Sequence, residues 1–169
     1  GLFRAPEDGS LREAMARLHD ALAAGATLFL FGERWDAEIA RRHLGDLLAP
    51  VAPTSFYEEF PDGDAEVVTD DEAPEAESFA SLVARDVRWL HGAACVRAQP
   101  GVTVPLWFRA RGPGRSGELF PLIARWRAGA TRVVWWAGGA YGTWGRALQQ
   151  RPEQFGRWWR AVMDFATRA

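Results

Sequence analysis

Segments with a helical spacing of apolar residues alternate along the chain with short, continuous apolar runs. Ser10 and Glu13 form a capping-box pattern that predicts the start of a helix, and the apolar periodicity continues to Gly25. The run at residues 27–31 is almost wholly apolar and ends at Gly32. Such a run is typical of a strand that is buried on both faces, so the chain is expected to open with a helix followed by a buried strand.

The same alternation continues through the rest of the chain. Further helices are predicted at residues 36–48, 79–90, 118–127 and 155–166, and further strands at residues 66–68, 104–108 and 131–136. Pro121 conflicts with the helix at 118–127, because a proline beyond the first turn removes a hydrogen bond, so this helix is expected to start late or to kink. The alternation of helices and strands predicts a parallel sheet covered on both sides.

Length and composition fit one globular unit. The chain has 169 residues, of which 48% are hydrophobic and 25% charged, and these are ordinary values for a folded domain. A single α/β domain spanning residues 1–169 is therefore expected.

The charged residues exclude several classes of protein. A net charge of -2 argues against a general nucleic-acid binder, which needs a basic face to displace counterions from phosphates. All 20 basic residues are arginine, so Schiff-base lysine chemistry and a Walker-type phosphate lysine are excluded. The acidic connection at residues 58–77 lacks the spacing and central glycine of a calcium loop, and we expect no metal and no cofactor there or elsewhere.

Cys95 is the single cysteine, so the chain can form no internal disulfide and no multi-cysteine zinc site. The cysteine is also not set in a nucleophile elbow. No apolar run approaches the roughly 20 residues that cross a bilayer, and no secretion signal is apparent. The sequence therefore predicts a cytoplasmic protein that has no membrane partner.

The order of these segments resembles the sugar isomerase (SIS) domain, a family of phosphosugar-binding proteins. Residues 23–32 are similar to the entry into that family's first strand and glycine turn, and residues 40–47 to the helix that follows. Residues 123–139 are similar to its helix, glycine turn and third strand. The resemblance implies a three-layer α/β/α sandwich with a mostly parallel, flavodoxin-like sheet.

The resemblance also implies a phosphate site at two loops. Large and charged side chains replace the family's small residues after Gly32, and arginines replace most of the hydroxyls of its serine-rich loop. Guanidinium groups can bind an anion in place of those hydroxyls. The predicted anion-binding residues are Gly32, Arg34, Arg109, Arg111, Gly114, Arg115 and Ser116.

A catalytic site is only partly present. His43 matches the helical histidine of phosphoheptose isomerases, but Leu47 stands where their glutamate would be, and Asp46 lies one position away. The last helix contains no histidine. His43 and Asp46 are the candidate catalytic residues for proton transfer, although a lone histidine on a helix is more often a packed or surface residue.

Nine tryptophans are present, and several lie in the last third of the chain. They are expected to pack in the core or to form a dimer face, and SIS domains typically associate, so a homodimer or higher homo-oligomer is expected. A glutamine-amidotransferase-like domain is a rival fold with the same parallel sheet, but its cysteine elbow is absent.

Three functions remain open. The first is a non-catalytic module that binds a phosphorylated sugar or similar small anion. The second is an active sugar-phosphate isomerase that uses His43, and the third is a structural dimer whose site has decayed. Whether the protein is an enzyme is left open by the sequence.

Overall fold

The computed structural model describes residues 8–32, 37–48, 51–60, 65–73, 75–83, 90–110, 117–139 and 149–168. The helices are α1 (Asp8–Ala23), α2 (Ala37–Leu44), the short 3-10 helix η1 (Gly45–Leu48), α3 (Ala76–Val83) and α5 (Pro152–Thr167). The strands are β1 (Thr27–Phe31), β2 (Val51–Glu59), β3 (Ala65–Thr69), β4 (Gly92–Ala98), β5 (Thr103–Ala110), β6 (Phe120–Ala128) and β7 (Thr131–Trp136).

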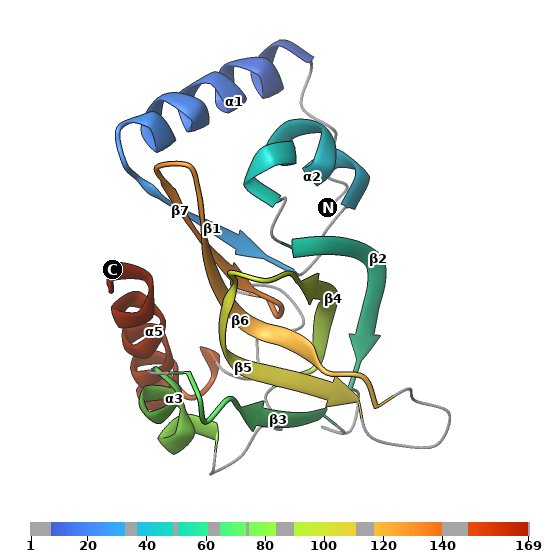
Figure 1. Cartoon of the computed structure of the whole chain (residues 1–169), viewed down its shortest axis with the longest axis vertical. Coiled ribbons are helices and arrows are strands. Elements are labelled where there is room, and N and C mark those ends of the chain that lie inside the picture. Colours follow the sequence, from blue (N-terminus) through green and yellow to red (C-terminus); the bar gives the residue numbers. More distant parts are fainter. Residues whose placement is uncertain are drawn as a thin grey trace.

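The main sheet is mixed, so the predicted flavodoxin-like sandwich with a mostly parallel sheet is wrong. Its five strands lie in the order β1-β7-β6-β5-β3 (Figure 1). Strands β1 and β7 are parallel, with Thr27 paired to Arg132 and Phe31 paired to Trp136. The three other pairings of this sheet are antiparallel. The described residues therefore form an α+β fold, in which neighbouring antiparallel strands need no crossover helices.

The error arises mainly at residues 118–127, where the predicted helix is instead strand β6. Leu122, Ile123 and Ala124 are all fully buried, so both faces of the strand are covered and the apolar run shows no alternation. Pro121 lies where the register between β5 and β6 is irregular, which is a position that a strand proline tolerates. Its carbonyl accepts a hydrogen bond of 3.3 Å from Trp135 Nε1.

A tight turn at Gly129 and Ala130 joins β6 to β7. Gly129 has a φ of 60°, a left-handed conformation that favours glycine and is common in two-residue hairpin loops. Ala128 pairs with Thr131 directly across this turn. Gly129, which was predicted to lie between a helix and a strand, therefore forms the turn of a β-hairpin.

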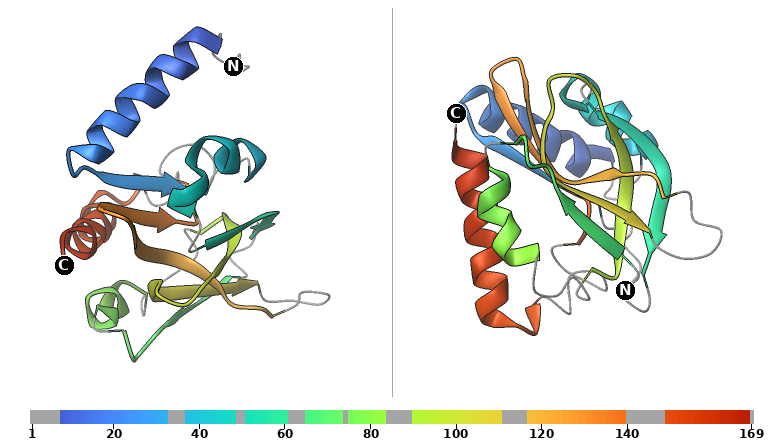
Figure 2. Two further views of the ribbon diagram at one scale, coloured as in Figure 1. Left: turned by 45° about the horizontal axis from the view of Figure 1, so that its top comes forward. Right: turned by 60° about the horizontal axis from the view of Figure 1, so that its bottom comes forward.

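A second, two-stranded antiparallel sheet is formed by β2 and β4 and was not predicted. Its residues 93–96 are small or medium-sized and almost completely buried. The amide of Ala94 donates a hydrogen bond of 2.8 Å to Ala137 O, which connects β4 to the end of β7. Figure 2 shows this sheet and α2 on one side of the main sheet, and α3 and α5 on the other.

The tryptophans that the structure describes are mostly core residues. Trp135, Trp136 and Trp158 have 3% or less of their surface exposed. The rings of Trp136 and Trp158 meet edge to face with centroids 4.7 Å apart, and Phe79 of α3 contacts Trp158 in the same way. Core packing therefore accounts for these side chains, and the homo-oligomer stays a prediction.

Several predicted elements are confirmed. The helices near both ends of the chain correspond to α1 and α5, and the strands at 27–31, 104–108 and 131–136 correspond to β1, β5 and β7. The short strand predicted at 66–68 is β3, and α3 covers the first part of the helix predicted at 79–90. No helix among the described residues is long and apolar enough to span a membrane.

Candidate functional site

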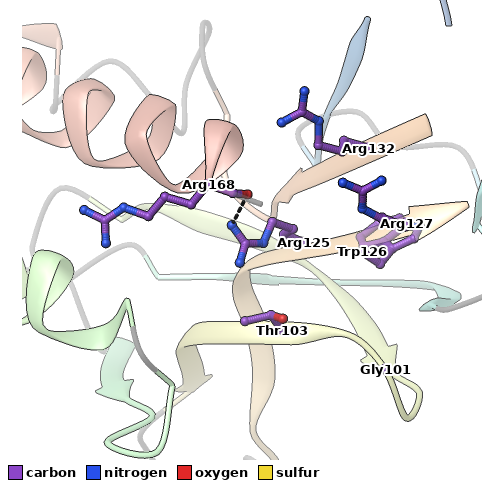
Figure 3. Close-up of a pocket in the computed structure, with 7 residues that line it drawn as sticks. All are labelled: Gly101, Thr103, Arg125, Trp126, Arg127, Arg132 and Arg168. Carbon is purple, nitrogen blue, oxygen red and sulfur yellow. Dashed lines mark hydrogen bonds between the residues drawn. The ribbon is translucent and has the colours of Figure 1, made fainter. Parts of the chain in front are cut away.

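A pocket of about 330 Å³ opens where β6 ends and β7 begins. We call it the arginine pocket, and its lining residues are Gly101, Thr103, Arg125, Trp126, Arg127, Arg132 and Arg168 (Figure 3). They come from the turn between β4 and β5, the start of β5, the two strands of the β6–β7 hairpin and the end of α5. Four of the seven residues are arginines, so the pocket has a strongly positive character.

The alternation of side chains on β6 explains how these arginines come together. Arg125 and Arg127 are two residues apart and therefore lie on one face of the strand. Arg127 pairs directly with Arg132 on β7, which places both side chains on that same face. Trp126 points to the other face, where it is 3% exposed and donates a hydrogen bond of 2.7 Å to Leu47 O. The buried indole thus anchors the strand between the two arginines.

Arg125 is held in place by a network of contacts. Its Nη2 donates a hydrogen bond of 2.6 Å to Oε1 of Glu75, and the side chains of this ion pair are only 14% and 9% exposed. Its Nη1 donates to Phe165 O at 2.6 Å and to Arg168 O at 2.9 Å. The guanidinium carbon also lies 4.6 Å from the centre of the Phe165 ring. The carboxylate of Glu75, two backbone carbonyls and the ring of Phe165 all contact this guanidinium, so its position is fixed.

The same network caps the carboxyl end of α5. The last carbonyls of a helix have no partner within the helix and carry a partial negative charge. Arg125 satisfies the carbonyl of Phe165, and Arg132 donates a longer bond of 3.3 Å to Thr167 O. The two arginines therefore have a structural role in addition to lining the pocket.

Among the residues that the structure describes, no carboxylate balances the remaining charges of the pocket. Within the described ranges, Arg127, Arg132 and Arg168 have no ion-pair partner, whereas Arg125 has Glu75. Arg127 and Arg132 are like charges placed directly across from one another, an arrangement that destabilises a strand pair unless an anion intervenes. In Figure 3 their side chains lie together on one side of Arg125, while the side chain of Arg168 extends to the other side.

The first predicted anion residue, Gly32, lies in a closely packed place. It is buried, and its amide donates to Trp136 O at 2.8 Å and to Gly138 O at 3.2 Å. A Cβ atom added to Gly32 would collide with the carbonyl of Ala137 and lie 2.8 Å from Cβ of Ala94. The glycine is therefore needed for a close approach of three chain segments, and its amide is already bonded.

The other predicted site residues are dispersed or lie outside the described ranges. Arg109 on β5 forms an ion pair with Glu66 on β3, with 2.5 Å between Nε and Oε2. His43 on α2 is partly exposed, and Asp46 lies in η1, where its side chain is not described. The residues outside the described ranges are Arg34, Arg111, Gly114, Arg115 and Ser116. Anion binding by that loop, and catalysis by His43 and Asp46, stay predictions.

No group of three or more metal-ligating side chains occurs in the part of the chain that the structure describes. The pocket arginines were missed because residues 118–127 were assigned to a helix. On a strand, the spacing of Arg125 and Arg127 places both on one face, and the hairpin turn at Gly129 then brings Arg132 opposite Arg127. Reading this segment with a period of two would have found the cluster.

Comparison with known proteins identifies a similar fold but no family. The cytoplasmic protein STM1381 from Salmonella typhimurium LT2 superposes with a TM-score of 0.58 and 18% sequence identity. The match covers 92% of this chain and 61% of that protein, so the chain spans about three fifths of its length. No family model matches the sequence, and no curated protein matches it either. The SIS resemblance therefore rests on the sequence segments alone, without the parallel sheet it implied.

Proposed function

We propose that this domain binds a small anion, of the phosphorylated-sugar type, in the arginine pocket and acts as a binding or regulatory module. The observation that carries the proposal is the group of three arginines, Arg127, Arg132 and Arg168, that lie around one pocket without carboxylate partners among the described residues. Guanidinium groups form paired, charge-assisted hydrogen bonds with phosphate and carboxylate oxygens.

Binding one anion would relieve an unfavourable feature of the free protein. Arg127 and Arg132 repel each other across the β6–β7 pair, and a phosphate group placed between them would replace this repulsion by two attractive contacts. A phosphate monoester carries about -1.5 to -2 charges at neutral pH, which matches two guanidinium groups. Thr103 and the backbone of Gly101 also line the pocket and offer neutral polar groups for the hydroxyls of a sugar.

The lining residues favour binding over proton transfer. Arginine stays protonated at physiological pH and so cannot act as a general base, and none of the seven lining residues is a histidine, carboxylate or cysteine. The isomerase alternative would need His43, which lies on α2 and does not line the pocket. We also propose a cytoplasmic location, which the description of the similar Salmonella protein as cytoplasmic supports.

The test is a thermal-shift titration of the protein with orthophosphate, glucose 6-phosphate and glucose, followed by calorimetry for any ligand that binds. A ligand that binds only the native state raises the melting temperature, and we expect the phosphate ester to do so while glucose does not. The variants Arg127→Ala and Arg132→Ala should each weaken binding by about tenfold or more, since a charge-assisted hydrogen bond contributes roughly 1.5–3 kcal/mol.

Arg160→Ala is the matched control, because Arg160 is an exposed arginine of α5 that does not line the pocket. This control should bind as the wild type does. If none of the phosphate compounds binds, or if the two pocket variants bind them unchanged, the proposal is wrong.

A further inference from the structure

Glu75 is a buried acidic side chain beside the arginine pocket, where it contacts Arg125. The residue is 7% exposed and lies immediately before α3, and its Oε1 accepts the hydrogen bond from Arg125. Its second oxygen, Oε2, is buried and has no hydrogen-bond partner among the described residues. A buried carboxylate with one bonded and one unbonded oxygen is costly, which calls for a reason beyond packing.

The charge of Glu75 acts directly on the pocket through Arg125. Burial reduces screening by solvent and salt, so a carboxylate in contact with a lining arginine affects a bound anion far more than a surface carboxylate does. Arg125 therefore contributes little net charge to the pocket, although it still presents hydrogen-bond donors. Of its five N–H groups, the two on Nη1 and one on Nη2 account for the three bonds to Phe165, Arg168 and Glu75.

We propose that Glu75 is a positioning residue that sets the ligand specificity of the arginine pocket. The negative charge of Glu75 offsets the positive charge of Arg125, which still offers hydrogen-bond donors, and so limits the affinity of the pocket for multiply charged anions. In this arrangement Arg127 and Arg132 balance the charge of a phosphate monoester. A diphosphate, which carries more charge, is bound less tightly than it would be by four arginines without a carboxylate partner. This inference rests on the proposed function, because it concerns anion binding at the same pocket.

The variant Glu75→Gln tests the charge with little change of shape. Glutamine keeps an oxygen that can accept the bond from Arg125, and its amide group can replace the unbonded Oε2. Arg125 should stay in place because the carbonyls of Phe165 and Arg168 still hold it. We expect the affinity for glucose 6-phosphate to rise by about tenfold, and that for pyrophosphate to rise further, since the Coulomb attraction grows with ligand charge.

Glu77→Gln is the matched control. Glu77 lies two residues further along, in the first turn of α3, and is exposed, so the effect of removing its charge is screened by solvent. We expect the affinities of this control to stay within about twofold of the wild type for both ligands.

The readout is the ratio of the two affinities, measured by calorimetry at low and at moderate salt, for the wild type and both variants. A purely structural role of Glu75 would lower the melting temperature and weaken both ligands alike, without raising the preference for pyrophosphate. If the Glu75→Gln variant binds the ligands with unchanged or lower affinity, the inference is wrong. The proposed function still stands in that case, provided that the wild type binds them. Absence of binding by the wild type would overturn both.

Discussion

The two ends of strand β7 differ in almost every physical respect. At its carboxyl end, Gly32, Ala94 and Ala137 approach so closely that no side chain fits at Gly32, and backbone hydrogen bonds link the three segments. At its amino end, Arg132 lies beside the open arginine pocket and the carbonyls at the end of α5. One end is apolar and closed, and the other is charged and open.

This difference shows where binding can occur in a mixed sheet. In open parallel sheets, ligands bind at the carboxyl ends of the strands, and the sequence resemblance implied a phosphate site at such a place, near Gly32 after the first predicted strand. Here strand β4 occupies the space at the carboxyl end of the parallel pair β1–β7. The amide of its Ala94 donates a hydrogen bond to the carbonyl of Ala137. The pocket lies instead at the opposite end, where the β6–β7 hairpin turns.

The largest effect is expected at the charged end, from the variant Arg125→Met. The change leaves Glu75 buried without its partner, and removal of one partner of a buried ion pair typically costs 3–5 kcal/mol. Urea unfolding of the wild type and the variant measures this loss of stability. The double variant Arg125→Met with Glu75→Leu should recover most of it, because no unpaired charge remains. A loss below about 1 kcal/mol in the single variant would show that this pair is not buried in solution.

A somewhat smaller loss is expected at the closed end, from Gly32→Ala. The added methyl group collides with backbone, which cannot move aside as a flexible side chain can, so we expect a cost near the upper part of the 1–3 kcal/mol range for overpacking. Gly156→Ala on α5 is the control, since nothing lies within 4 Å of its added Cβ. Alanine should stabilise that helix by about 0.5–1 kcal/mol. Equal melting temperatures for the two variants would contradict the close packing at Gly32.

The smallest effect concerns an exposed ion pair beyond the closed end, between Arg97 and Glu118. The hydrogen bond from Arg97 lowers the pKa of Glu118 below its ordinary value of 4.5. Because the folded-state pKa is depressed, the stabilisation is present above pH 4.5 and is lost as the pH falls through the lower folded-state pKa. Unfolding of Glu118→Gln and wild type at a series of pH values should therefore show curves that converge in acid. Parallel curves would argue against the pair.

The local elements were more predictable than their arrangement. Helices with a clear apolar stripe, such as α5, and isolated apolar runs, such as β1 and β7, were found because one dominant periodicity identifies each. Strand β6 was not predicted, because it is buried on both faces and its run of apolar residues also fits a helix. Pro121 was the one residue in this segment that argued against a helix. Once β6 was read as a helix, a parallel sheet followed.

Prediction of the candidate site also depended on whether residues 118–127 were assigned to a helix or to a strand. Arginines on a predicted helix would point in different directions, whereas on β6 and β7 they share one face. The contribution of Glu75 could not be predicted at all, since its contact with Arg125 joins residues 50 positions apart and depends on how α3 packs. Sequence patterns define local faces, but a site made from distant segments depends on the tertiary fold.

The parallel pairing of β1 with β7 has a consequence for the order of folding. These strands lie about a hundred residues apart, whereas β5, β6 and β7 follow one another in the chain. Short loops close early and at little entropic cost, while the longest closure must wait until the rest of the chain compensates for it. The antiparallel strands β5 to β7 can thus form a nucleus by themselves. We expect strand β1, which leads into the crowded Gly32, to be added last and to complete the sheet.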